Sequence, residues 1–199
     1  MKILGPLGRI GIFLVVLCAA APDALPRITT TAATKPSKAK AKSSEAISSK
    51  QLEQLCRGLK QKNSAAPYAK LSVIASRKPS GVLGARAALA LGYYDYTKGH
   101  YAQASKWLAI AQTDPLLRDY ALYWSAEANL ALNHNAEALA QLKRFRHEYP
   151  DSVITDEALQ ALGTAALALS EPAEILNALD AYPQTKEKPA LLFLRAEAG

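Results

Sequence analysis

Cysteine and histidine are scarce in this chain of 199 residues, which holds 2 Cys and 3 His. Cys18 lies in an apolar run near the N-terminus, so a mature chain that has lost this run keeps only Cys56 and can form no internal disulfide. Because Cys56 shares a helical face with leucines, we expect a buried, inert thiol there. The alternative is a reactive thiol in an oxidising compartment.

The sequence also lacks the motifs of catalytic and metal sites. It has no HExxH motif and no glycine-rich phosphate loop, and no Cys or carboxylate falls at ligand spacing from a histidine. Paired carboxylates such as Glu171 and Glu174 fall in the first turns of expected helices, where acidic side chains favour the helix dipole. We therefore expect no catalytic residue, no metal and no cofactor in this chain.

Positive charge is unevenly distributed. Residues 1–82 carry 14 Lys or Arg and 3 Asp or Glu, a net charge of +11, whereas residues 83–199 carry 10 and 14, a net charge of −4. The basic character therefore belongs to the leading part of the chain. The body is mildly acidic, and we expect no nucleic-acid partner for it.

Residues 1–24 have the organisation of a secretory signal peptide. Lys2 and Arg9 precede the apolar run "IGIFLVVLCAAA" at 10–21, which is shorter than the roughly 20 apolar residues of a membrane-spanning helix. A lipoprotein signal would place Gly, Ala or Ser before its modified Cys, whereas Leu17 precedes Cys18. We expect plain cleavage near residues 21–25 and a periplasmic protein.

Residues 25–49 are expected to form a disordered tether rich in Lys, Ser, Thr and Ala. They hold too few large apolar side chains to offset the entropy of ordering the chain. Their simplest role is that of a solvated spacer. The alternative is contact with an anionic envelope surface, such as lipid headgroups or cell-wall polymer, through Lys35, Lys38, Lys40, Lys42 and Lys50.

A period of 34 residues runs through the rest of the chain. It relates Gly92 to Ala126, Gly99 to Asn133, Ala104 to Ala138 and Leu108 to Leu142, and each pair is small, apolar or turn-forming. Two helical stretches per unit at this period are typical of tetratricopeptide repeats. The expected fold class is all-α, an α-solenoid of antiparallel helix pairs.

We divide the body into units of this period. Residues 85–118 and 119–152 form two units, residues 153–184 align as a third after a shift to 37, and residues 185–199 begin an incomplete fourth. Residues 50–82, ahead of them, are expected to form a degenerate helix pair, with Leu52, Leu55, Cys56 and Leu59 on one face.

Local signals fix further expectations. The small residues Gly92, Ala126, Gly163 and Ala196 are placed at helix crossings, where a larger side chain would push the helices apart. Gly99 and Asn133 are expected to adopt the left-handed conformation that ends a helix. Asp114 before Pro115, and Ser152 after Pro150, are expected to cap the helices that follow.

The first unit resembles the tetratricopeptide repeat at Leu91, Gly92, Gly99, Tyr101, Ala104, Leu108, Ala111 and Pro115, and the second at Ala126, Ala138, Leu142 and Pro150. In that family the first helix of each unit lines a concave groove that binds extended peptides or other partners. The matching positions here are Arg86, Leu89, Tyr93, Tyr96, Tyr120, Tyr123, Glu127, Glu157, Gln160 and Thr164. The alternative is that several of these aromatic side chains fill the core between repeats.

Two wider resemblances compete. The signal peptide, the Ala-rich repeats and the stretches "RDYALYWSAEANLAL" and "LKRFRHEYPDS" resemble the N-terminal helical solenoid of soluble lytic murein transglycosylases. That resemblance implies the non-catalytic part of a peptidoglycan-cleaving enzyme, whose glutamate-bearing domain is not in these residues. "FRHEYPDSVITDEALQALG" is also similar to non-enzymatic envelope adaptors of the outer-membrane assembly or cell-division type, which bind a protein partner.

The stretch "LLFLRAEAG" at 191–199 resembles the start of another unit, "LYWSAEAN" at 122–129. Natural repeat arrays finish with a polar capping helix, which these leucines do not provide. We therefore expect these residues to belong to the front of a longer protein, and the isolated chain to aggregate or dimerise through residues 191–194.

Overall fold

The computed structural model describes residues 47–61, 64–182 and 188–199, and every regular element among them is an α-helix. The all-α expectation is confirmed. The predicted signal peptide and nearly all of the predicted tether lie outside the described residues. Lys50, counted above among the tether lysines, lies in the first described helix.

The helices follow one another with short connections. In chain order they are α2 (Ser49–Gly58), α3 (Ala65–Ala75), α4 (Gly81–Thr97), α5 (Tyr101–Ala111), α6 (Arg118–Ala131), α7 (Asn135–Glu148), α8 (Thr155–Ala168), α9 (Pro172–Asp180) and α10 (Pro189–Ala198).

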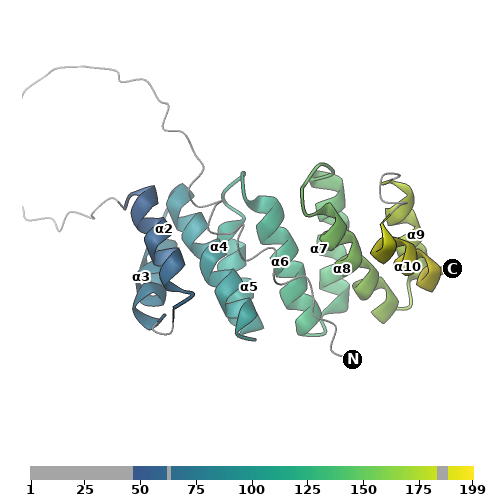
Figure 1. Cartoon of the computed structure of the whole chain (residues 1–199), viewed down its shortest axis with the longest axis horizontal. Coiled ribbons are helices and arrows are strands. Elements are labelled where there is room, and N and C mark those ends of the chain that lie inside the picture. The colour runs from purple at the N-terminus through teal and green to yellow at the C-terminus, as the bar shows by residue number, and fades with distance from the viewer. Residues whose placement is uncertain (1–46, 62–63, 183–187) are drawn as a thin grey trace, which may run out of the picture.

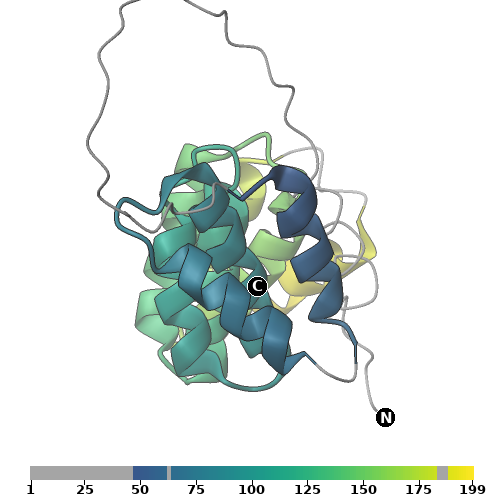
Figure 2. The same cartoon turned by 90° about the vertical axis from the view of Figure 1, so that its left-hand side faces the viewer.

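These helices stand side by side in a row, and each packs against the next one along the chain (Figure 1). Helix α6 also contacts both α4 and α8, so these three helices form one side of the row. Figure 2 looks along the row from the end formed by α2 and α3. None of the described helices combines the length and the apolar character that crossing a membrane would need.

Small residues let the helices approach closely. A Cβ atom at Gly92 in α4 would lie 2.6 Å from Cγ of Leu108 in α5, and Ala104 and Ala126 are completely buried. Any larger side chain at position 92 would therefore force the two helices apart. Gly163 in α8 is equally crowded, but by Leu194 of α10 rather than by α9.

The end of the row differs from what the sequence predicts. Ala196 is exposed, because α10 packs against α8 and α9 through the buried residues Leu191 and Leu194 instead. Leu192 and Phe193 are exposed, at 47% and 65%. Only two of the four side chains at 191–194 are therefore exposed to solvent.

The turns within successive helix pairs have the same geometry. Gly99, Asn133 and Ser170 all have positive φ angles, of 78°, 60° and 60°. In each turn the backbone N–H of the next residue donates to the carbonyl five residues earlier: His100 to Asp95 at 2.9 Å, His134 to Asn129 at 2.9 Å and Glu171 to Ala166 at 2.8 Å. The turns recur at 34 and then 37 residues, as the sequence predicts.

Both capping predictions are wrong. Helix α6 begins at Arg118 and α8 at Thr155, and neither has a side-chain cap. The Asp114 carboxylate is instead buried in an ion pair with Arg86. Ser152 Oγ donates to Asp119 Oδ2 at 2.6 Å, which joins the start of α6 to the connection before α8. Both side chains also accept a local hydrogen bond, Asp114 Oδ1 from the Leu116 N–H at 3.1 Å and Ser152 Oγ from the Ile154 N–H at 3.5 Å, but in the turns that precede the helices.

Candidate functional site

The ten residues predicted to line a groove all lie on α4, α6 or α8, the three helices of one side of the row. Arg86, Leu89, Tyr93 and Tyr96 are on α4, Tyr120, Tyr123 and Glu127 on α6, and Glu157, Gln160 and Thr164 on α8. The sequence pattern therefore selected residues of one side, but their exposure differs.

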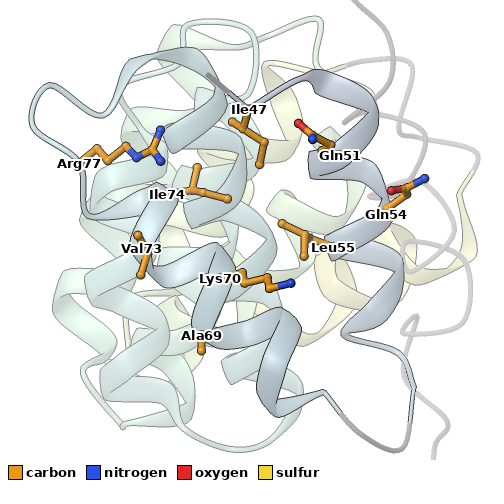
Figure 3. A pocket seen from close by; sticks show the side chains of 9 residues that line it. All are labelled: Ile47, Gln51, Gln54, Leu55, Ala69, Lys70, Val73, Ile74 and Arg77. Atoms are coloured by element: carbon orange, nitrogen blue, oxygen red, sulfur yellow. The ribbon is translucent and has the colours of Figure 1, made fainter. Parts of the chain in front are cut away.

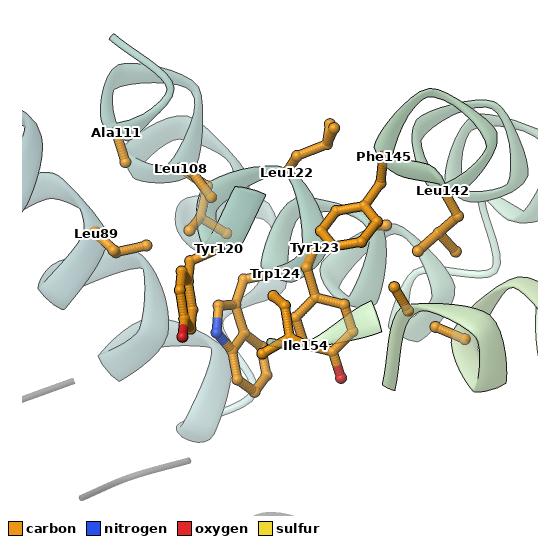
Figure 4. Close-up of a cluster of buried hydrophobic side chains, with 14 of the residues drawn as sticks. Leu89, Leu108, Ala111, Tyr120, Leu122, Tyr123, Trp124, Leu142, Phe145 and Ile154 are labelled. Carbon is orange, nitrogen blue, oxygen red and sulfur yellow. The ribbon is translucent and has the colours of Figure 1, made fainter. Parts of the chain in front are cut away.

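Arg86, Leu89, Tyr120 and Tyr123 are buried. The Arg86 guanidinium, 4% exposed, places Nε 3.2 Å from Oδ2 of Asp114, which is 2% exposed, so this arginine holds α4 to the connection before α6. Figure 4 shows Tyr120 and Tyr123 extending from α6 within the cluster of apolar side chains. These four positions agree with the alternative that core packing explains part of the pattern.

The other six positions reach the surface to different degrees. Tyr93, Tyr96, Glu127 and Glu157 are half-buried, and Gln160 and Thr164 are exposed. The two α8 side chains bond within their own helix: Gln160 Nε2 donates to the Asp156 carbonyl and Thr164 Oγ1 to the Gln160 carbonyl. The structure thus brings together Tyr93, Tyr96 and Glu127 as the polar part of this side.

Trp124 is the residue that the sequence interpretation missed. Its ring centroid lies 4.9 Å from that of Tyr93, 5.0 Å from that of Tyr96 and 5.1 Å from that of Tyr123. The side chain is buried, and its indole Nε1 has no hydrogen-bond partner. A signal was present, because the equivalent position 34 residues earlier holds the small residue Ala90, so a large ring replaces a small side chain in the second unit.

Glu127 lies at the edge of these rings. Tyr96 Oη donates a hydrogen bond of 3.0 Å to Glu127 Oε2, which links α4 to α6. Burial raises the pKa of the Glu127 carboxyl, and hydrogen bonds from the Tyr96 and Tyr123 hydroxyls oppose that rise. We call Glu127 together with the rings of Tyr93, Tyr96, Tyr123 and Trp124 the Glu127 site.

The two tyrosines next to Glu127 remain protonated donors at neutral pH. Burial and the neighbouring Glu127 charge raise the pKa of the Tyr96 and Tyr123 hydroxyls well above their usual range. Neither hydroxyl can therefore serve as a base. The arrangement fixes a carboxyl group beside aromatic rings, with two hydroxyl groups close to it.

A second polar cluster joins α3, α4 and α5. Tyr68 Oη donates to Asp95 Oδ2 at 2.8 Å, Trp107 Nε1 donates to Tyr68 Oη at 3.2 Å, and exposed His100 has Nδ1 3.5 Å from Asp95 Oδ1. Among the described residues, no Ser or Thr hydroxyl is hydrogen-bonded to His100. The Asp–His pair thus lacks the third group that nucleophilic catalysis needs, and the cluster connects helices.

A groove of about 700 Å³ lies between α2 and α3 at the end of the row (Figure 3). Its lining is mostly apolar, with Leu55, Val73 and Ile74 among the side chains that face it. Two lining residues, Lys70 and Arg77, are basic, and none is acidic. The sequence interpretation did not foresee this groove, because it depends on how far apart two helices lie.

The residues that the structure describes contain no group of three or more His, Cys, Asp or Glu side chains able to hold a metal ion. Comparisons with protein-family models, with curated proteins and with solved structures find no match to this chain.

Proposed function

We propose that this chain is a helical-repeat scaffold of the bacterial cell envelope that binds a protein or peptide partner on the side formed by α4, α6 and α8. The half-open Glu127 site on that side is the observation that carries this proposal. Its Tyr and Trp rings belong to the residue types that are enriched where proteins bind one another, and Glu127 adds a charged group beside them. The region has no catalytic role of its own.

The repeat geometry supports an α-solenoid of the tetratricopeptide type. Equivalent turns carry the same hydrogen bonds and left-handed residues at offsets of 34 and 37, and the first helices of successive pairs contact one another. A solenoid of this kind offers an extended surface built from equivalent positions of successive repeats. On that basis residues 50–82 form the leading pair and residues 83–199 the repeats.

For the wider context, we propose the non-catalytic N-terminal part of a peptidoglycan lytic transglycosylase in the periplasm. The predicted signal peptide and the sequence resemblance support this context. The alternative is a non-enzymatic envelope adaptor, and the Glu127 site favours it because a charged, aromatic site suits a protein ligand. In both contexts the same side of the row makes the contact.

The binding side can be tested by photo-crosslinking in cells. A photoreactive amino acid at Gln160, exposed on α8, should give a crosslinked product of discrete mass. The same substitution at Ala140, exposed on α7, is the matched control and should give none. Equal labelling at the two positions, or none at either, would contradict the proposal.

A sedimentation assay separates the two contexts. Purified chain is mixed with isolated peptidoglycan and centrifuged. Pelleting with peptidoglycan supports the cell-wall enzyme, whereas a chain that stays in solution, while Gln160 still crosslinks to one protein, supports the adaptor.

A further inference from the structure

We infer that the Glu127 site binds a cationic side chain, Lys or Arg, of the partner. This inference rests on the proposed function, because it names the chemistry that the α4–α6–α8 side would recognise. Three features of the site support it: the carboxylate has no cation, the surrounding rings offer faces to one, and the nearby charges are negative.

The first feature is the missing counter-ion. Seven ion pairs are present among the described residues, and Glu127 takes part in none of them. Its contact at 3.0 Å is with Tyr96 Oη, a neutral donor. By contrast the buried carboxylate of Asp114 is paired with Arg86. A half-buried carboxylate without a cation is energetically unfavourable, and local rules are broken in this way mainly at functional sites.

The second feature is the set of rings. The rings of Tyr93 and Tyr96 have their centroids 4.9 Å and 5.0 Å from that of buried Trp124, and these two tyrosines are themselves only half-buried. A cation over such faces is attracted by the ring electrons, and Trp and Tyr are the strongest partners for it. Lys98 Nζ lies 5.6 Å from the centre of the Tyr94 ring, and Tyr94 is not one of the rings of the Glu127 site. No lysine or arginine of the described chain fills the Glu127 site.

The third feature is the local charge. The negative charge of Glu157 in α8 raises the pKa of Tyr120 and Tyr123, and the negative charge of Glu127 raises the pKa of Tyr96 and Tyr123. No positive side chain acts on Glu127 or on these tyrosines. Burial disfavours the charged form of Glu127 and so raises its pKa. A bound cation would relieve this penalty, whereas an anionic ligand would increase it.

The test varies the charge of the ligand and of the site separately. The probe is a capped pentapeptide of alanine with one central arginine, compared with the same peptide carrying uncharged citrulline. Binding is followed by the NMR signal of the Trp124 indole N–H. We expect the arginine peptide to bind at least roughly tenfold more tightly, since a charge-assisted contact is lost in citrulline.

The matched protein variants are Glu127→Gln and Glu137→Gln. Glutamine at position 127 can still accept the hydrogen bond from Tyr96, so the fold is kept while the charge is lost. Glu137 is an exposed carboxylate on α7. We expect Glu127→Gln to weaken arginine-peptide binding by roughly tenfold or more, and Glu137→Gln to leave it unchanged.

Three results would overturn the inference. They are equal binding of both peptides, unchanged binding in Glu127→Gln, or no binding of the arginine peptide at a concentration of about 10 mM, which would mean an affinity too weak for specific recognition. Failure of this inference is distinguishable from failure of the proposed function. If the Glu127→Gln chain still crosslinks its partner at Gln160 with unchanged yield, partner binding on the α4–α6–α8 side is supported, whereas recognition of a cationic side chain by Glu127 is not.

Discussion

The Glu127 site and the groove between α2 and α3 differ in how they are built. Side chains of α4 and α6 meet in the Glu127 site, where rings pack at about 5 Å and a hydrogen bond joins the helices. The groove is an open space between two helices, lined by apolar and basic side chains. One surface is acidic and tightly connected, and the other is basic and loosely filled. The comparison teaches that the two surfaces differ in charge as well as in packing.

The largest expected effect concerns the buried ion pair between Arg86 and Asp114. Replacing Asp114 by Ala leaves the Arg86 guanidinium buried without its partner, which should lower the free energy of unfolding by about 3–5 kcal/mol. Urea unfolding followed by circular dichroism measures this change.

The matched control for Asp114→Ala is Glu148→Ala, which breaks the exposed pair with Arg144. Exposed pairs contribute about 0–1 kcal/mol, so little change is expected. Similar losses in both variants would show that Asp114 is not held as tightly as its burial indicates.

The next effect tests the link between α4 and α6. Tyr96→Phe keeps the ring but removes the hydroxyl that donates to Glu127 Oε2, so the protein should lose about 1.5–3 kcal/mol. Tyr101→Phe, on the ring that contacts Tyr96, is the control and should change stability little. If the two variants melt alike, the hydrogen bond contributes nothing to the stability of the Glu127 site.

A smaller effect is a pH dependence specific to Glu127. Burial raises the pKa of this carboxyl above its usual range, so the folded state binds the proton more tightly than the unfolded state. Lowering the pH from 7 through the raised pKa should therefore stabilise the wild-type chain relative to Glu127→Gln. Above that pKa the difference should be constant. Urea titrations of both chains between pH 7 and 4.5 measure it, and a difference that falls with falling pH would contradict the burial argument.

The smallest effect is expected in the groove. Val73 is exposed although it lines the groove, so Val73→Ser should change stability by no more than about 0.5 kcal/mol. Ile74→Ser, on the adjacent buried residue, is the control and should destabilise the protein far more. A large loss in Val73→Ser would show that the groove is filled by packing, which would remove the contrast with the Glu127 site.

Local signals predicted the helices and turns well. Spacing of small residues placed Gly92 and Ala126 at helix crossings, and Gly99 and Asn133 in left-handed turns, because these features depend on neighbours along the chain. Predictions failed where a distant partner decides the outcome. Asp114 was expected to cap a helix, but Arg86, 28 residues earlier, binds its carboxylate.

The residues expected to line a groove share one side of the row, but their exposure was not predicted. The family pattern selected residues of α4, α6 and α8, yet it could not tell buried Tyr123 from half-buried Tyr93. It also passed over Trp124, which occupies a core position and still contacts three tyrosines. The exposure of a side chain on one helix depends on how the neighbouring helices are rotated about their axes. The spacing of residues in the sequence does not determine that rotation.

The packing of each helix on its neighbours along the chain has a kinetic consequence. Contacts between segments close in sequence give a low contact order, which favours fast folding, and in such rows folding can begin at any pair and spread outward. Within the described row, the helices at the two ends pack less extensively than α6, so in this chain they should open before it. Glu127 and its rings lie in the middle of the row, where amide hydrogen exchange should be slowest. A partner would thus meet a recognition surface that persists while the ends of the row fluctuate.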